Sequence, residues 1–305
     1  MVSVYLPIAE MPVDVFLVLA MSGAVGFVSG LVGVGGGFLM TPLLFFAGVP
    51  PAVAASTVAA QITATSVSGV LAYWRRRLVD WRMGVVLTVA GILGSIVGVR
   101  LFAAMHAIGQ VDLLITLAYV FFLCGIGGLM LWESVGALAR KRRGLPAATR
   151  RRRRTLAHKL PMRVRFPSSG LYISVLPPLA IGFGVGVLAA VMGVGGGFIL
   201  VPAMIYVLRM PTQVVVGTSL VQVLIVTALV VVLQSTQTKT VDLALAVLLI
   251  IGGVIGAQLG VRTGAKLSAE RLRAILAVLV LCTGMKLAYD LVATPTELFV
   301  LGSVR

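Results

Sequence analysis

The stretch GLVGVGGGFLMTPLL at residues 30–44 decides how this chain folds, because it recurs as AVMGVGGGFILVPAM at residues 190–204. Each copy holds four glycines within five residues, and a proline follows five residues after the last glycine. Glycine costs a helix about 1 kcal/mol relative to alanine, so each cluster predicts a break between two helices. The recurrence indicates an internal duplication with one such break in each half.

The residues around both clusters are those of a membrane protein. Of 305 residues, 59% are hydrophobic and 11% are charged, and the mean hydropathy is +1.10. Several apolar runs approach the ~20 residues that span a bilayer core, and the short alternating segments of a β-barrel are absent from the sequence. We therefore predict an all-α polytopic membrane protein. Glu10 and Asp14, in place of a positive leader, predict a first helix that is retained rather than cleaved.

The duplication extends well beyond the glycines. Pro50, Thr57 and Gln61 match Pro211, Thr218 and Gln222, and GILGSIVGVR at 91–100 matches GVIGAQLGVR at 253–262. The predicted repeats are residues 1–135 and 171–305, joined by an Arg-rich loop at 136–170. Each repeat is expected to contain a long helix, a short apolar piece after the glycines and then three more long helices. In the first repeat these segments are predicted at 13–33, 38–49, 52–73, 83–104 and 111–132. In the second repeat they are predicted at 171–192, 198–208, 212–234, 243–264 and 271–292.

The two short pieces are too short to cross a bilayer at normal thickness. Each piece either crosses a thinned region or pairs with the preceding helix as a re-entrant hairpin; both arrangements give five segments per repeat and therefore inverted repeats. Outside the long loop, this topology places nine Lys and Arg inside and four outside, whereas four segments per repeat give six and six. The positive-inside rule favours inverted repeats in the cytoplasmic membrane, with both termini outside and the loop in the cytoplasm.

The formal net charge of +16 comes largely from that loop, since twelve of the 25 Lys and Arg lie between positions 140 and 165. Basic segments that bind nucleic acid carry interleaved aromatic residues, which this segment lacks, so we expect no nucleic-acid partner. A solvated cytoplasmic loop is the simpler interpretation, and binding of anionic lipids at 140–165 is the more specific one. Cys124 and Cys282 lie in apolar segments without metal-ligand spacing, which indicates ordinary packing.

The helix breaks are the first candidate binding site. Broken backbone inside a membrane is tolerated only beside protein or a polar cavity, and a helix start carries a partial positive charge that favours anions. The candidate substrate-binding residues are Gly35, Gly36, Gly37 and Phe38 in the first repeat and Gly195, Gly196, Gly197 and Phe198 in the second. Close helix packing is the alternative, although it calls for glycines at every fourth position. GILGSIVG and GVIGAQLG have that spacing and predict packing surfaces.

Polar residues on the helices after the breaks are the second candidate. Thr57 and Gln61 are four residues apart and share a helix face, as do Thr218 and Gln222. They either form interhelical hydrogen bonds or line a central anion site together with the helix starts, and the sequence leaves both interpretations open.

Missing residues exclude other classes of function. Between Glu133 and Asp242 the sequence has no acidic residue, and His106 and His158 are expected in loops. We therefore expect no mid-membrane carboxylate for proton or Na⁺ coupling, no catalytic residues, no metal site and no cofactor, so the chain is not expected to be an enzyme.

The paired GVGGG clusters, the G-x-x-G-x-x-x-G-x-R stretches and the helix pattern resemble the sulfite exporter TauE/SafE family over nearly the whole chain. The resemblance implies a transporter of a small sulfur-containing anion, sulfite or an organosulfonate such as sulfoacetate, with its site at Gly35–Gly37 and Gly195–Gly197. Export is favoured because a negative cytoplasm drives anions outward. There are two alternatives: an uptake permease for thiosulfate or a sulfonate, and a ten-helix exporter of another small metabolite. The sequence does not predict the oligomeric state.

Overall fold

The computed structural model describes residues 3–32, 37–142, 163–166, 169–264 and 269–292. Two short hairpins accompany ten helices in this part of the chain, and each hairpin precedes five helices. The first group is β1 (Ser3–Leu6), β2 (Met11–Asp14), α1 (Val15–Val32), α2 (Gly37–Phe46), α3 (Pro51–Arg75), α4 (Trp81–Ile108) and α5 (Val111–Arg142). The second group is β3 (Arg163–Phe166), β4 (Leu171–Ser174), α6 (Leu176–Met192), α7 (Gly197–Tyr206), α8 (Thr212–Gln237), α9 (Leu243–Gly264) and α10 (Ala269–Val292).

These elements confirm the predicted all-α fold class. Among the described residues, eight helices contain 17 to 32 residues, and the two after the glycine clusters, α2 and α7, contain ten each. Five of them, α3, α4, α5, α8 and α9, are long and apolar enough to cross a bilayer. The fold is therefore that of a polytopic membrane protein.

The two hairpins were not predicted from the sequence. β1 pairs with β2 and β3 with β4, both antiparallel, and residues 163–174 of the second hairpin follow residues 3–14 of the first by 160 positions. The helix predicted from residue 171 consequently begins at Leu176, and 171–174 form a strand. Pro177 and Pro178 fit the first helical turn, where proline lacks only an N–H that would be unpaired anyway.

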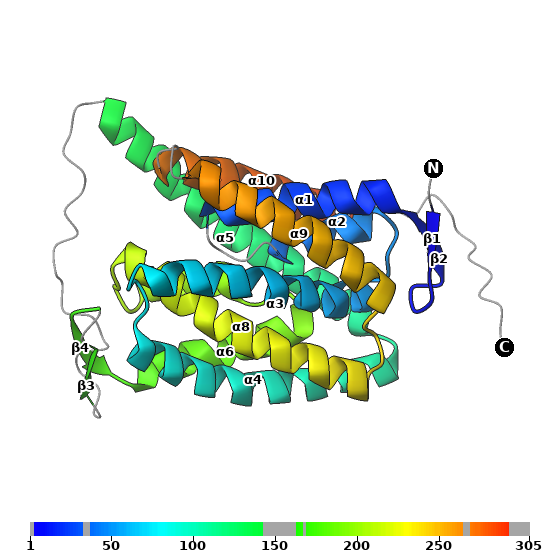
Figure 1. Cartoon of the computed structure of the whole chain (residues 1–305), viewed down its shortest axis with the longest axis horizontal. Helices are drawn as coiled ribbons and strands as arrows, with labels where there is room; N and C mark the ends of the chain where they lie inside the picture. Colours follow the sequence, from blue (N-terminus) through cyan, green and yellow to red (C-terminus); the bar gives the residue numbers. More distant parts are fainter. Residues whose placement is uncertain (1–2, 33–36, 143–162, 167–168, 265–268, 293–305) are drawn as a thin grey trace.

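The two repeats run in opposite directions through the bundle. Figure 1 places the β1–β2 hairpin at one end of the bundle and the β3–β4 hairpin at the other, with the long helices lying between them. Helices pair across the repeats: α1 packs along α9, and α4 packs along α6 in the same way. Matching hairpins at opposite ends are what inverted repeats require.

Glycines allow these cross-repeat pairs to approach closely. A methyl group added at Gly26 would meet Gly253 backbone, and one at Gly186 would meet Gly91 backbone. The GILGSIVG and GVIGAQLG stretches therefore form packing surfaces, as the sequence predicts, because no side chain fits between the two backbones.

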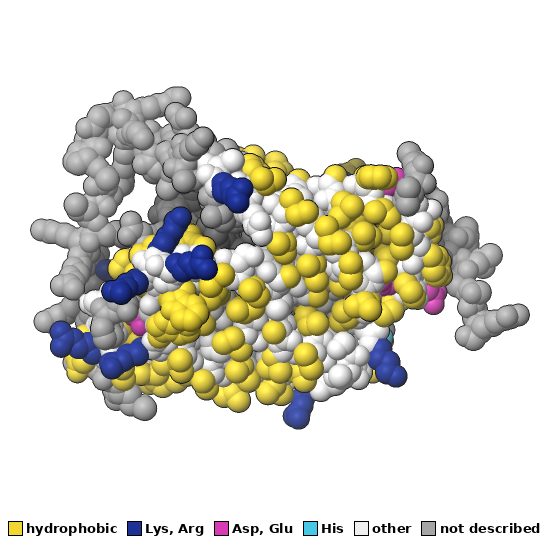
Figure 2. Space-filling model, in the orientation of Figure 1, with side chains coloured by type: hydrophobic (Ala, Val, Ile, Leu, Met, Phe, Trp, Pro, Cys, Tyr) yellow, Lys and Arg dark blue, Asp and Glu magenta, His cyan; other side chains and the backbone are white. Residues whose placement is uncertain are grey.

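Charge distinguishes the two ends. Figure 2 shows a mostly hydrophobic middle, with many of the visible Lys and Arg side chains gathered at the β3–β4 end. Arg82 donates a 3.3 Å hydrogen bond from Nη1 to the Arg165 carbonyl in β3, which ties the loop after α3 to this hairpin. We call this the arginine-rich end; its described members include Arg75, Arg76, Arg77, Arg82, Arg165, Arg209 and Arg262.

Candidate functional site

The second glycine cluster breaks the helix as predicted. α6 ends at Met192, Gly193 forms its left-handed C-cap, and α7 begins at Gly197. Gly195 and Gly196 have φ of 69° and 72°, a conformation that residues with a Cβ adopt at a cost of about 1–2 kcal/mol. In the first cluster Gly33–Gly36, which include the candidates Gly35 and Gly36, lie outside the described residues, between the end of α1 at Val32 and the start of α2 at Gly37.

The two short helices meet at the centre of the bundle. The rings of Phe38 and Phe198, the second residues of α2 and α7, stack with centroids 5.2 Å apart and planes 23° from parallel. Ile62 of α3 borders both breaks: a methyl group at Gly37 would overlap its side chain, and one at Gly195 would lie 2.8 Å from its Cγ2. The structure thus brings Gly37, Phe38, Gly195 and Phe198 together around one residue.

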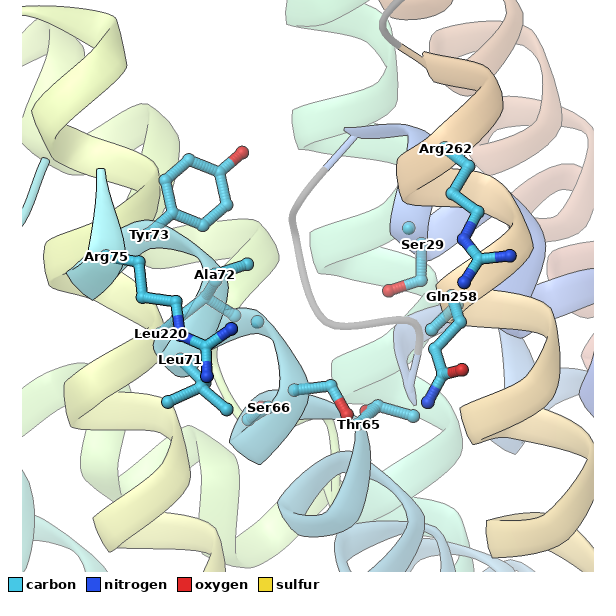
Figure 3. Close-up of a pocket in the computed structure, with 14 residues that line it drawn as sticks. Ser29, Thr65, Ser66, Leu71, Ala72, Tyr73, Arg75, Leu220, Gln258 and Arg262 are labelled. Carbon is cyan, nitrogen blue, oxygen red and sulfur yellow. The ribbon is translucent and has the colours of Figure 1, made fainter.

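A pocket of about 550 Å³ lies between α1, α3, α8 and α9 and reaches toward the arginine-rich end. Figure 3 shows Arg75 of α3 and Arg262 of α9 on opposite walls, with Ser29 and Gln258 on the α1–α9 side. The lining residues are Ser29, Gly30, Thr65, Ser66, Ser68, Gly69, Leu71, Ala72, Tyr73, Arg75, Leu220, Ala257, Gln258 and Arg262. No acidic side chain is among them, so the pocket is electropositive.

Hydroxyl groups of α3 line the deeper part of the pocket. Thr65 Oγ1 donates to the carbonyls of Gln61 and Ile62, at 3.0 and 3.1 Å, as threonines in helices commonly do. Ser66 is 1% exposed, and its Oγ has no hydrogen-bond partner within the described part of the chain. A buried hydroxyl without a partner costs free energy, which a bound acceptor would recover.

The pocket lies close to the junction of the two breaks. Ser66 follows Ile62 by one helical turn, so the hydroxyls at the pocket floor lie on the helix that borders Gly37 and Gly195. On the α1 wall, Ser29 and Gly30 line the pocket shortly before the first glycine cluster. A small anion that enters between Arg75 and Arg262 would therefore approach the central helix starts.

Thr57 and Thr218 form the interhelical hydrogen bonds that the sequence left as one interpretation. Thr57 Oγ1 accepts a 3.0 Å bond from the backbone N–H of Asp242, and Thr218 Oγ1 accepts one of 3.0 Å from Asp80. Each bond joins one repeat to the other. Both threonines are fully buried and lie away from the pocket lining.

Gln61 and Gln222 are also buried where helices of the two repeats cross. Gln61 Nε2 donates to Ser22 Oγ at 3.1 Å, and Gln222 Nε2 lies 3.5 Å from the Gly182 carbonyl. Neither side-chain oxygen has a partner within the described residues, and neither glutamine lines the pocket. Both hydrogen bonds join helices of the same repeat, α3 to α1 and α8 to α6, whereas Gly253 and Gly91 of the opposite repeat lie against the two amides.

From the polar residues after the first break, the sequence analysis selected Thr57 and Gln61 and not Thr65, Ser66 or Ser68 of the same helix, and it missed both arginines. Arg75 and Arg262 were counted among loop charges, although Arg262 ends the recurring G-x-R stretch and Arg75 is the last residue of α3. Their position on a pocket depends on how α3 and α9 cross. No group of three or more His, Cys, Asp or Glu in the described chain is placed to hold a metal ion.

Comparison with known proteins gives a consistent result. The family model for "Sulfite exporter TauE/SafE" matches residues 18–287. A "Probable membrane transporter protein" of Xylella fastidiosa strain 9a5c is 31% identical over 264 residues, covering 85% of this chain and 88% of the relative. YjnA of Bacillus subtilis, also a "Probable membrane transporter protein", is 26% identical over 273 residues, covering 88% and 98%.

A plant protein shares part of the chain. The "Sulfite exporter TauE/SafE family protein 3" of Arabidopsis thaliana is 37% identical over 122 residues, which cover 38% of this chain and 25% of the plant protein. No solved structure gives a significant match.

Proposed function

Because this chain belongs to the sulfite exporter TauE/SafE family of membrane transporters, we propose that it exports a small sulfur-containing anion by alternating access. Sulfite, or an organosulfonate such as sulfoacetate, is the proposed substrate. The observation that carries the proposal is the pocket between Arg75 and Arg262, which combines two cations with several hydroxyls and no acidic side chain. Sulfite and sulfonate oxygens accept hydrogen bonds from guanidinium and hydroxyl groups.

The arginine-rich end is proposed to face the cytoplasm, with both termini outside and residues 136–170 in the cytoplasm. The positive-inside rule supports this orientation. Trp74 and Trp81, which contact each other edge to face at 5.8 Å and are 56% and 47% exposed, place a membrane interface beside the arginines in this proposal, whichever side that interface faces. Binding of anionic lipids at 140–165 remains part of the proposal.

Export then follows from the charge of the substrate. Moving a monoanion out of a negative cytoplasm is favourable by about 2.3 kcal/mol per 100 mV. The pocket opens to the side from which an exported anion is collected. Uptake of thiosulfate or a sulfonate is the second candidate, and it would need a coupling ion to work against the same potential.

The experiment is anion flux in proteoliposomes at set membrane potentials, with radiolabelled sulfite, sulfoacetate and thiosulfate. Arg75→Gln and Arg262→Gln should each raise KM roughly tenfold, since a charge-assisted hydrogen bond is lost. Arg76→Gln is the matched control, because Arg76 is exposed beside Arg75 but does not line the pocket.

Several outcomes would contradict the proposal. Unchanged KM in both pocket variants would remove the arginines from substrate binding. Transport of neutral or cationic metabolites without anion flux would favour the exporter of another metabolite. Accumulation against an inside-negative potential would establish uptake instead of export.

A further inference from the structure

Matching positions of the two repeats, such as those in the two hairpins, lie toward opposite ends of the bundle. The contacts themselves fix this correspondence: Thr57 binds the N–H of Asp242 just as Thr218 binds that of Asp80, both at 3.0 Å. A methyl group at Gly253 would lie 2.5 Å from the Gln61 amide nitrogen, and one at the matching Gly91 would lie 2.9 Å from that of Gln222. The pocket residues therefore have definable counterparts.

Several counterparts of the pocket residues are less polar or larger, although Ala257 corresponds to the more polar Ser95. Ser29, Gly30, Thr65, Gly69 and Gln258 correspond to Ala189, Ala190, Val226, Val230 and Ile96. At the opposite end, methyl groups thus replace the hydroxyls of Ser29 and Thr65, and alanine and valine side chains replace the two glycines. The cations are unequal as well, because Arg262 corresponds to Arg100, whereas Arg75 corresponds to Thr236.

The counterpart region is closed in this structure. Ala189, Ala190, Val226 and Val230, each at most 1% exposed, form one apolar cluster with Ala59 and Val99. Gln234, the counterpart of Tyr73, donates a 2.8 Å hydrogen bond from Nε2 to the Ala190 carbonyl beside this cluster. The bundle is therefore open toward the arginine-rich end and packed shut where the same pocket would open at the other.

We propose that this apolar cluster is the second, low-affinity anion site of the transporter, formed when the bundle opens at the opposite end. The inference rests on the proposed function. In that state the anion would face Arg100 and the Thr227 hydroxyl, the counterpart of Ser66, but no second arginine. Losing one charge-assisted hydrogen bond and the hydroxyls of Ser29 and Thr65 weakens binding by roughly tenfold to a hundredfold.

A lower affinity for the anion on the outer side speeds release of the anion there, but it supplies no energy for transport. At zero potential and equal concentrations a passive carrier produces no net flux, so the ratio of Vmax to KM must be the same in both directions. The asymmetry therefore appears in KM and in Vmax separately: both are low from the arginine-rich side and high from the other.

The test compares inside-out and right-side-out membrane vesicles clamped at zero potential, with radiolabelled sulfite and sulfoacetate. KM from the arginine-rich side should be at least roughly tenfold lower than KM from the opposite side. The double variant Ala189→Ser, Val226→Thr should lower KM on the opposite side by several fold. Threonine is tolerated at position 226 because its hydroxyl can bond the carbonyl four residues earlier, as Thr227 does to Val223 at 2.8 Å.

Ile225→Thr is the matched control, since Ile225 lies on the same helix but is 42% exposed and its counterpart Ala64 does not line the pocket, and both KM values should stay unchanged. Thermal stability of each variant in detergent separates altered binding from misfolding. Equal KM from both sides, or unchanged KM in the double variant that folds, would overturn this inference while leaving anion transport intact. A lack of flux for every anion from either side would overturn the proposed function, and this inference with it.

Discussion

The hydroxyl of Thr57 accepts a 3.0 Å hydrogen bond from the backbone N–H of Asp242, which lies 185 residues further along the chain, in the other repeat. Asp242 is fully buried, and its carboxylate in turn accepts from the backbone N–H groups of Ile8 and Leu245, at 3.0 and 3.1 Å. One side chain thus holds the start of α9 and the turn of the first hairpin together. The matching Asp80 accepts from Met83 N, Ser169 N and Ser169 Oγ.

Thr57→Val is expected to destabilise the protein by about 1–3 kcal/mol, because it leaves the buried N–H of Asp242 without a partner. Thr218→Val should do the same at the other end. KM for the anion should not change, since neither residue lines the pocket. Thermal unfolding in detergent and flux measurements check both points, with the more exposed Thr116→Val as the control. A raised KM with unchanged stability would return Thr57 to the list of ligands.

Ser66→Ala should give the opposite result to Thr57→Val: it should weaken anion binding without lowering the stability of the protein. The Ser66 hydroxyl is buried without a partner within the described chain, so its removal should leave stability unchanged or raise it by about 1 kcal/mol. KM should rise several fold if this hydroxyl binds the anion. Ser219→Ala is the matched control, because Ser219 is equally buried in α8 but donates to the Val216 carbonyl and, like its counterpart Val58, lies outside the pocket. Equal KM in both variants would argue against Ser66 as a ligand.

Gly196→Ala should abolish most of the flux. At φ of 72° an alanine is strained, and its Cβ would overlap the Val185 side chain, so the start of α7 has to shift. Gly184→Ala, in α6 next to Val185, is the control, because its Cβ would have no atom within 4 Å. Flux at least roughly tenfold below the control, with an unchanged size-exclusion profile, is the expected result. Normal flux would exclude the geometry of this break from the mechanism.

Cysteine labelling should report which end of the bundle is open. In a Cys124→Ala, Cys282→Ala background, Ser68→Cys should react with a membrane-impermeant maleimide in inside-out vesicles, since it lines the pocket. Val230→Cys should be protected in the state seen here, because this side chain is fully buried in the apolar cluster, and it should react from the opposite side only when the cluster opens there. Labelling of Ser68→Cys only from the outside would reverse the proposed orientation.

The sequence alone determined the membrane class, the internal duplication and the break at residues 193–196. Each rests on local composition: apolar runs of bilayer length specify helices, and adjacent glycines interrupt a helix wherever it lies. The glycine stretches at 91–98 and 253–260 predicted close packing for the same local reason. The hairpins at 3–14 and 163–174 gave no comparable signal, because strands of four residues are too short for a recognisable pattern and their turns are held by the buried Asp242 and Asp80.

Only the tertiary structure decided which polar residues face a cavity. Thr57 and Ser66 are both hydroxyl residues on α3, yet the crossing of α3 with the opposite repeat directs the first to Asp242 and the second to a pocket. Arg75 and Arg262 lie 187 positions apart and face each other only because α3 and α9 cross near their ends (Figure 3). Helical periodicity assigns a residue to a face of its own helix, but which partner covers that face depends on packing between distant segments.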